Sequence, residues 1–265
     1  VVVDLEAIAK VADEAGVPLV VDNTMATPFL CQPFEWGADL VVHSTTKFLS
    51  GQGNAVGGVV IDSGKFPWLG NSKFPSLSTP SPEYNGLTFA ETFGDLAYTM
   101  YSHAISLRDL GCTQSPMNAW ITLNGIETLP LRMERHCSNG LAVAKYLEKQ
   151  ANVEWVSHAG LESSPYFELG KKYLPEGTGS VFTFGVKGGY ESGLKMLESV
   201  ELFSHVANIG DTRSLILHPA STTHRQLTEE QRIAAGAGPE VIRLSIGIEC
   251  VEDIISDLDQ ALNCL

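Results

Sequence analysis

Two short apolar segments, residues 17–21 and 39–42, constrain the fold most, because each runs directly into polar residues. A helix-like spacing of apolar residues precedes the first segment, with Asp4 as the expected cap and Gly16 as the expected end. Helix, strand, short connection and strand in this order are typical of an α/β layer with a largely parallel sheet. Such sheets bind ligands beyond the carboxyl ends of their strands, so a site is expected there.

The pattern changes along the chain. A stretch rich in Pro, Ser, Gly and Asn at residues 64–81 predicts a loop long enough to border a site. Two helical segments follow, and the second contains Pro130, where we expect it to bend or divide. They cover residues 89–109 and 118–150. Short strands then mix with helices, so a domain boundary is predicted near residue 130. The strands are predicted at 153–157, 180–186 and 241–246, and the helices at 191–197 and 251–262.

Composition excludes several classes of function. The chain has 31 acidic and 17 basic side chains and a net charge of −14, which repels nucleic acid and anionic membranes. No apolar run approaches the roughly 20 residues of a membrane helix, so we expect a soluble protein without a nucleic-acid or membrane partner. The five cysteines are scattered, form no C-x-x-C pair and follow no signal peptide. Reduced thiols and a cytoplasmic location are therefore expected.

Lys47 lies in the apolar-flanked run VVHSTTKFL, residues 41–49, which is unusual for a side chain that prefers the solvated surface. Burial would favour the neutral amine, the form that attacks a carbonyl to make a Schiff base. Ser44 and Thr46 add two hydroxyl groups that can bind a phosphate. The alternative is a lysine at a strand end that simply reaches water, so Lys47 needs support from a second residue.

Asp22 provides that support, because it ends the preceding predicted strand. The ends of two parallel strands open onto one edge of the sheet, so Asp22 and Lys47 can approach one ligand from different sides. A carboxylate facing a pyridine nitrogen keeps it protonated, and the pyridinium is the electron sink of pyridoxal 5′-phosphate (PLP). Without Lys47, a helix cap or turn would explain Asp22 equally well. Together the two residues predict a PLP site.

Arg243 lies in the apolar run VIRLSI, residues 241–246, where a guanidinium is costly unless it binds an anion. A substrate carboxylate would supply that anion through a two-pronged contact, and a structural ion pair is the alternative. His218 and His224 are six residues apart without a neighbouring acidic or thiolate cluster. No metal site is therefore predicted.

The segments VVDNT (residues 20–24) and STTK (residues 44–47) together resemble the cofactor motif of the PLP-dependent Cys/Met metabolism family. The resemblance covers essentially the whole chain. It implies the aspartate-aminotransferase-like architecture, fold type I: an α/β fold with a mostly parallel sheet, truncated here, and a smaller α+β C-terminal domain. Residues 1–130 would be the C-terminal part of the large PLP-binding domain, and residues 131–265 the small domain.

The resemblance also implies a role for each candidate residue. Lys47 would bind the cofactor covalently and act as the catalytic base, while Asp22 would pair with the pyridine nitrogen. Ser44 and Thr46 would hold the phosphate. Arg243 would clamp the substrate carboxylate.

Within the family, the run GDTRSLILHPASTTH (residues 210–224) is similar to the branch of O-acetylhomoserine sulfhydrylases. Lyases acting on cystathionine commonly carry an acidic residue and a serine where this chain has Ala207 and Asn208, which argues for a smaller substrate. Asn208 is expected to help orient the substrate carboxylate. The implied reaction, in methionine biosynthesis, is γ-replacement on O-acetyl-L-homoserine with sulfide or methanethiol, giving homocysteine or methionine and acetate.

Two alternatives stay open: γ-elimination of methionine or cystathionine on the same scaffold, and a catalytically silent fragment. The family's site also needs a Tyr-x-Arg pair from a neighbouring subunit and a ring-stacking tyrosine, both upstream of residue 1. The chain begins Val1-Val2-Val3, without methionine. We therefore expect its partners to be its own N-terminal segment and the other subunits of a homotetramer.

Overall fold

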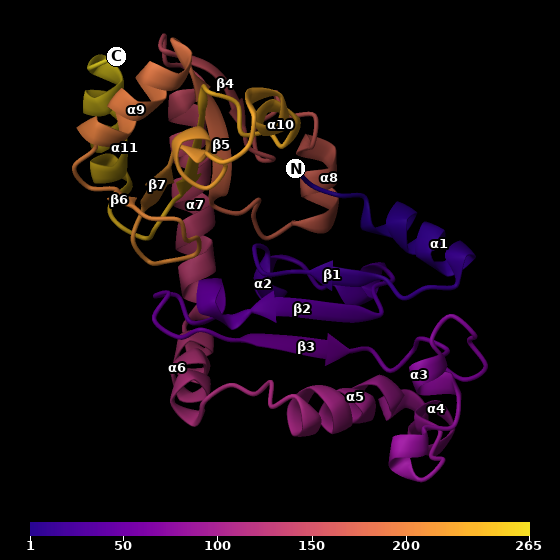
Figure 1. Ribbon diagram of the computed structural model, residues 1–265. Helices are drawn as coiled ribbons and strands as arrows, with labels where there is room; N and C mark the ends of the chain where they lie inside the picture. The colour runs from indigo at the N-terminus through magenta and orange to yellow at the C-terminus, as the bar shows by residue number, and fades with distance from the viewer.

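The first of two sheets consists of β1 (Val20–Asp22), β2 (Leu40–Ser44) and β3 (Gly58–Asp62). β1 runs parallel to β2 with Asp22 opposite Val42, and β3 runs antiparallel to β2. Figure 1 shows this sheet in the computed structural model, which describes residues 1–265. The parallel pair was expected from the sequence, whereas β3 was not, and it makes the sheet mixed.

Helix α1 (Leu5–Ala15) begins and ends as the sequence predicts. The Asp4 carboxylate accepts a hydrogen bond from the backbone N–H of Ala7 at 3.2 Å. Gly16 has φ +59°, a left-handed conformation that glycine adopts without a steric penalty, and its N–H closes the last turn. A short helix α2 (Thr27–Leu30) and a single turn at Pro33–Trp36 then connect β1 to β2.

The region after β3 forms a small helical layer around an aromatic cluster. It contains α3 (Pro75–Ser78), α4 (Phe89–Phe93), α5 (Ala97–Ser102) and a wide turn at His103–Asp109. Buried Phe66, Trp68, Leu77 and Phe89 form the centre of this cluster. The predicted loop at 64–81 is therefore held in place by its own apolar side chains. These side chains do not follow a helical spacing, so the sequence pattern did not predict this packing.

Helices α6 (Pro116–Glu127) and α7 (Leu129–Leu147) are separate, with the break at Thr128. Pro130 lies in the first turn of α7, where its missing N–H costs no hydrogen bond. The expected division near Pro130 is confirmed. In Figure 1, α7 rises from the first sheet into the second, and the arrows of β1 and β2 point toward it.

The second sheet has the strand order β4-β5-β8-β7-β6. Its strands are β4 (Val153–Ser157), β5 (Val181–Val186), β6 (Ser204–His205), β7 (Leu215–Leu217) and β8 (Val241–Ser245). All neighbouring pairs are antiparallel except β6 and β7. The helices of this half are α8 (Phe167–Tyr173), α9 (Gly189–Ser199), α10 (Glu229–Ala234) and α11 (Val251–Asn263).

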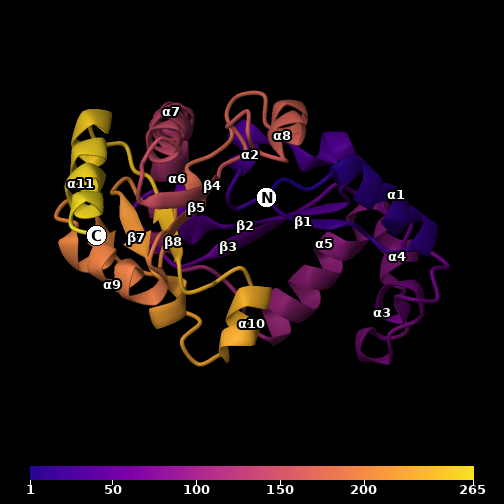
Figure 2. The same ribbon diagram turned by 90° about the horizontal axis from the view of Figure 1, so that it is seen from above.

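The largest hydrophobic core lies between the second sheet and the helices α7, α9 and α11. Figure 2 shows α9 and α11 on the outer side of this sheet, away from the first sheet. A smaller core joins Phe48 and Leu49, which follow β2, to Leu129 and Met133 of α7. Helix α7 therefore supports both sheets. None of the helices is sufficiently long and apolar to cross a membrane.

Candidate functional site

Lys47 lies in a single helical turn, Thr45–Leu49, at the carboxyl end of β2. Its own backbone dihedral angles, φ −92° and ψ −129°, depart from the helix and interrupt the turn. The neighbouring Phe48 is buried in the core shared with α7, whereas the Lys47 side chain is only partly buried. The turn therefore fixes the backbone, while the Lys47 side chain stays partly accessible to a ligand.

Asp22 and Ser44 line the same cavity as Lys47, which has a volume of about 610 Å³. Asp22 ends β1 and Ser44 ends β2, so parallel pairing brings both to one edge of the sheet. The Asp22 carboxylate accepts a hydrogen bond from the N–H of Thr24 at 3.0 Å. The N–H of Ser44 donates to the Thr24 hydroxyl at 2.8 Å, so Thr24 connects the two strand ends.

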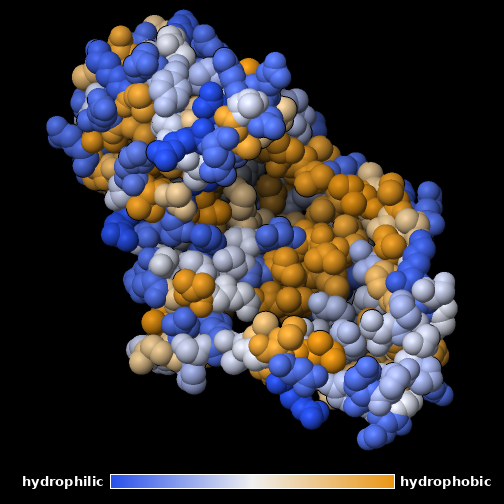
Figure 3. Space-filling view, viewed as in Figure 1, coloured by the Kyte–Doolittle hydropathy of each residue, from blue (hydrophilic) through white to orange (hydrophobic).

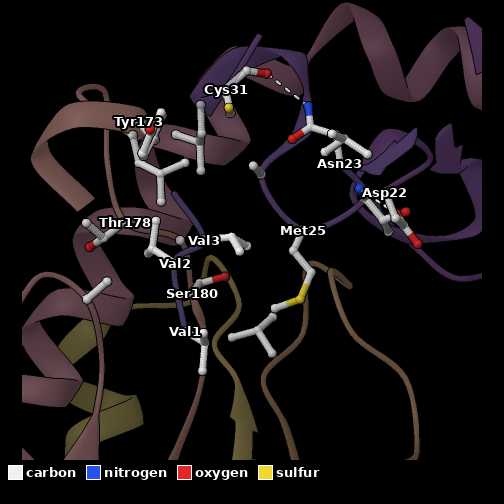
Figure 4. Close-up of a pocket in the computed structure, with 18 of the residues that line it drawn as sticks. Val1, Val2, Val3, Asp22, Asn23, Met25, Cys31, Tyr173, Thr178 and Ser180 are labelled. Atoms are coloured by element: carbon white, nitrogen blue, oxygen red, sulfur yellow. Dashed lines mark hydrogen bonds between the residues drawn. The ribbon is translucent and has the colours of Figure 1, made fainter. Parts of the chain in front are cut away.

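The other walls of the cavity come from the chain start and from the second half of the molecule. Figure 4 shows Val1 to Val3 and Ser180 on the side facing the Asp22–Met25 segment. The Ser180 hydroxyl is buried without a hydrogen-bond partner. Residues 64–81, expected as a possible border of the site, do not line this cavity.

Asn208 connects Lys47 to Arg243. Its side-chain oxygen accepts a hydrogen bond from Lys47 Nζ at 2.5 Å, and its backbone oxygen accepts one from Arg243 Nη2 at 3.2 Å. Arg243 lies in β8 opposite Thr183 and forms no ion pair with a carboxylate. Partial burial lowers the pKa of its guanidinium. A partly buried cation without an ion-pair partner is the arrangement expected of an anion-binding residue.

Thr46 is directed elsewhere. Its hydroxyl accepts a hydrogen bond from the N–H of Gly57 at 3.1 Å and lies 3.4 Å from the Gly57 carbonyl oxygen. Thr46 does not line the cavity. The structure thus brings Lys47, Asp22 and Ser44 together, while Thr46 braces the segment between β2 and β3.

His43 is buried one residue before Ser44, and its Nδ1 has no hydrogen-bond partner. Burial lowers the pKa of its imidazole, and the Asp22 charge acts in the opposite direction. The neutral ring is therefore the form that the fold favours.

The cavity-lining residues fit PLP by their chemistry. Lys47 offers an amine for the aldehyde, Asp22 a carboxylate for the ring nitrogen and Ser44 a hydroxyl for the phosphate. The volume lies within the usual range of small-molecule sites. The unpartnered Ser180 hydroxyl adds a polar group that a ligand can satisfy. No group of His, Cys, Asp and Glu side chains is arranged to hold a metal ion.

Arg132 and His136 of α7 are two buried polar residues near the site that the sequence did not identify. Arg132 donates to the backbone oxygen of Phe48 at 2.7 Å. Their signal in the sequence is weak, because charged residues four apart on a helix are usual on a solvated face. An arginine one turn after a helix start, followed by a histidine on the same face, was the only available sign.

Comparison with known proteins gives consistent results. Residues 1–263 match the family described as Cys/Met metabolism PLP-dependent enzyme. The chain is 49% identical to an O-acetyl-L-homoserine sulfhydrylase of Leptospira meyeri and 50% identical to a homocysteine synthase of Schizosaccharomyces pombe, in each case over 98% of its length. It spans only 60% and 61% of these relatives.

A solved structure is similar over nearly the whole chain. It is a Campylobacter jejuni protein provisionally named O-acetylhomoserine (thiol)-lyase, and it contains a pyridoxyl-lysine phosphate. The TM-score is 0.95 and the sequence identity 39%, covering 99% of this chain and 63% of that one. The α/β architecture expected from the sequence is therefore confirmed.

Proposed function

Because the chain belongs to the PLP-dependent enzymes of Cys/Met metabolism, we propose that it forms part of a transferase acting on O-acetyl-L-homoserine. The reaction is replacement of the acetyl-bearing oxygen at Cγ by sulfide, which yields homocysteine and acetate. Methanethiol in place of sulfide yields methionine. The sulfhydrylase and synthase names of the similar proteins support this choice of substrate.

One observation carries the proposal: Lys47, Asp22 and Ser44, which come from two strand ends, line a single cavity. PLP, when bound, supplies an electron sink for a carbanion at the substrate Cα. Lys47 Nζ is the group placed to take and return the Cα proton. Asp22 holds the proton on the ring nitrogen, and Ser44 contributes to phosphate binding.

Arg243 and Asn208 orient the substrate in this proposal. The Arg243 guanidinium binds the α-carboxylate, replacing its present contact with the Asn208 carbonyl. The Asn208 amide is neutral, so it cannot form an ion pair with a second amino group such as that of cystathionine. The Thr46 hydroxyl is a second candidate for phosphate binding, and its contact with the Gly57 N–H fixes the chain beside it.

We further propose that another polypeptide segment covers the first sheet. Val20 is 50% exposed and Val60 is 51% exposed, although strands of α/β sheets are normally buried on both faces. Figure 3 shows a broad apolar surface in the hollow over this sheet. About two fifths of each similar protein lies outside the part matched here, which is enough chain to supply the cover.

We propose the following domain organisation and assembly. Residues 1–130 are the C-terminal part of the large PLP-binding domain and residues 131–265 the small domain. The assembly is proposed to be a homotetramer in the cytoplasm, where the five free cysteines would stay reduced.

The test uses this chain together with the remaining segment of its polypeptide, here called the assembled enzyme. Homocysteine is measured with O-acetylhomoserine and sulfide, and 2-oxobutyrate with methionine or cystathionine alone. We expect homocysteine in the first assay, and absorbance of bound cofactor that is lost in Lys47→Ala. A yellow, active Lys47→Ala enzyme would contradict the role of Lys47. Predominant 2-oxobutyrate would indicate the elimination reaction instead.

A further inference from the structure

Arg132 is a buried cation that no carboxylate neutralises. Its residue is 8% exposed, and it takes part in none of the four ion pairs of the chain. Burial lowers the pKa of the guanidinium. Its nitrogen atoms donate to neutral oxygens only: those of Phe48, Leu49, Gly125 and Thr128. A buried arginine is costly, so these contacts must offset a substantial desolvation penalty.

The contacts complete the hydrogen bonding of the turn that carries Lys47. The N–H of Ser50 donates to the Thr45 oxygen at 3.1 Å, the N–H of Gly51 donates to the Lys47 oxygen at 2.8 Å, and the Ser50 hydroxyl donates to the Thr46 oxygen at 3.1 Å. The last two carbonyl oxygens of the turn accept hydrogen bonds from Arg132. Nη1 donates to the Phe48 oxygen at 2.7 Å, and Nη2 donates to the Leu49 oxygen at 3.3 Å. The orphan carbonyls at the end of this turn are thus capped by one side chain from another helix.

Two glycines let Arg132 and α6 approach the turn closely. A β-carbon at Gly51 would lie 2.6 Å from Arg132 Nη1, and one at Gly125 would lie 2.7 Å from the Ser50 Cα. The Gly125 oxygen accepts a second hydrogen bond from Arg132 Nη2 at 2.7 Å. The guanidinium therefore connects the end of α6 to the turn Thr45–Leu49, here called the lysine turn.

The same face of α7 holds the strand that carries Arg243. His136, one turn after Arg132, contacts the Ile246 oxygen through Nδ1 at 2.7 Å and packs edge-on against Phe48. Asn139 donates to the backbone oxygens of Gly247 at 3.1 Å and Glu249 at 2.9 Å. Positions 132, 136 and 139 share one face of α7. Through these residues a single helix contacts both the lysine turn and the segment that follows β8.

We propose that Arg132 is a positioning residue for Lys47: it fixes the lysine turn on α7 and thereby sets Lys47 in register with Arg243. The inference rests on the proposed function in that Lys47 is taken as the reactive amine. The fixing of the turn itself can be tested without cofactor.

The first experiment measures amide hydrogen exchange of the chain without PLP, at Ser50 and Gly51, whose N–H groups close the turn. Arg132→Met removes the cap and is expected to speed exchange there by roughly tenfold or more, since hydrogen bonds to charged groups are among the strongest. Arg132→Lys keeps the charge but loses the planar guanidinium that donates to several oxygens, so it should speed exchange less. If Arg132→Met does not fold, Arg132→Lys alone tests the proposal.

Val143→Ala is the matched control, because Val143 is fully buried on the same helix but packs in the core of the second sheet. It should lower the melting temperature without selectively speeding exchange at Ser50 and Gly51. Protected amides in Arg132→Met, or in Arg132→Lys where that alone folds, would overturn the proposal. Equal acceleration by Val143→Ala would do the same.

The second experiment treats the assembled enzyme, wild type and each variant, with PLP and borohydride, and measures labelling at Lys47 relative to the other lysines by peptide mass. We expect selective labelling of Lys47 in the wild type. The selectivity should fall moderately in Arg132→Lys and further in Arg132→Met, and it should not fall in Val143→Ala. Unchanged selectivity in both Arg132 variants would refute the positioning role. Absence of selective labelling in the wild type would count against the proposed function, while the exchange experiment still decides whether Arg132 fixes the turn.

Discussion

Asn208 accepts a hydrogen bond from Lys47 Nζ at 2.5 Å, although 161 residues separate the two in the chain. The backbone oxygen of the same asparagine accepts a hydrogen bond from Arg243. One residue from the second half of the molecule therefore contacts both the candidate reactive amine and the candidate carboxylate clamp. The acceptor at Lys47 is a neutral amide, which holds the amine in place without an ion pair.

Asn208→Asp is expected to slow the reaction of Lys47 with PLP. The new carboxylate would pair with the Lys47 ammonium and compete with attack on the aldehyde. We expect a decrease of roughly tenfold in the rate of borohydride-trapped labelling, from an added interaction of about 1.4 kcal/mol. Asn208→Ala removes the acceptor without adding charge and should slow the reaction less. Equal rates in the wild type and Asn208→Asp would show that this contact does not influence the amine.

Arg243→Lys is expected to weaken substrate binding in the assembled enzyme. Lysine keeps the charge but cannot make the two parallel hydrogen bonds that a guanidinium gives to a carboxylate. We expect KM for O-acetylhomoserine to rise by roughly tenfold or more, with kcat changed less. Steady-state kinetics at several substrate concentrations measure both. A variant with unchanged KM would identify Arg243 as a structural residue of β8.

The sequence indicated which residues gather at the sheet edge better than it indicated the contacts that hold them there. Lys47, Asp22 and Ser44 follow strand signals directly, and local patterning is enough to place such residues at a sheet edge. Their connection through Asn208 depends on a contact between two halves of the chain, which no periodicity encodes. The cap by Arg132 was missed for the same reason.

The helices and strands also differ in how well local sequence patterns predicted them. The predicted strand at 153–157 agrees with β4, and the predicted helix at 251–262 ends one residue before the end of α11. β3 was missed, because its apolar run directly follows a glycine-containing segment that reads as a loop. It is recognised as a strand only by its pairing with β2. Thr46 was expected at the phosphate; its hydroxyl contacts Gly57 in this structure, and its role at the phosphate stays a prediction.

Acid is expected to destabilise the chain through its buried histidines. Burial lowers the pKa of His158 from the ordinary value of 6.5, and the same holds for His136 and His218. The unfolded chain takes up a proton near pH 6.5 while the folded chain resists it. The free energy of unfolding therefore falls as the pH drops through 6.5 toward the native pKa, by at most about 1.4 kcal/mol per pH unit for each proton.

Urea denaturation at a series of pH values between 7.5 and 5 measures this slope. His158→Gln should flatten it, because one of the resisting groups is gone. His103→Gln, at an exposed position, is the control and should leave the slope as in the wild type. If both variants retained the full slope, the proton uptake would have to be assigned to other groups.

Gly125→Ala is expected to destabilise the chain and to loosen the lysine turn. The new β-carbon would overlap the Leu49 carbonyl oxygen and lie 2.7 Å from Ser50 Cα, so backbone must move. Overpacking of this kind costs about 1–3 kcal/mol. Gly58→Ala is the control, because its β-carbon would meet the His43 oxygen at an ordinary 3.4 Å. Thermal denaturation compares the two, and equal melting temperatures would mean that α6 shifts freely on the turn.

Val60→Thr tests whether the first sheet is covered in the assembled enzyme. Val60 is 51% exposed in this chain, so a hydroxyl in place of a methyl group should change the free energy of unfolding of the isolated chain by at most about 0.5 kcal/mol. If a further segment packs on the sheet, the same substitution buries a polar group and should cost the assembled enzyme about 1–3 kcal/mol.

Val41→Thr is the matched control, since Val41 is 3% exposed and lies opposite Ile61 in the same sheet. It should cost the isolated chain and the assembled enzyme alike. Urea denaturation of both forms gives the four values. A Val60→Thr cost near zero in the assembled enzyme would mean that the apolar surface over β3 stays open to water, and the covering segment would then have to lie elsewhere.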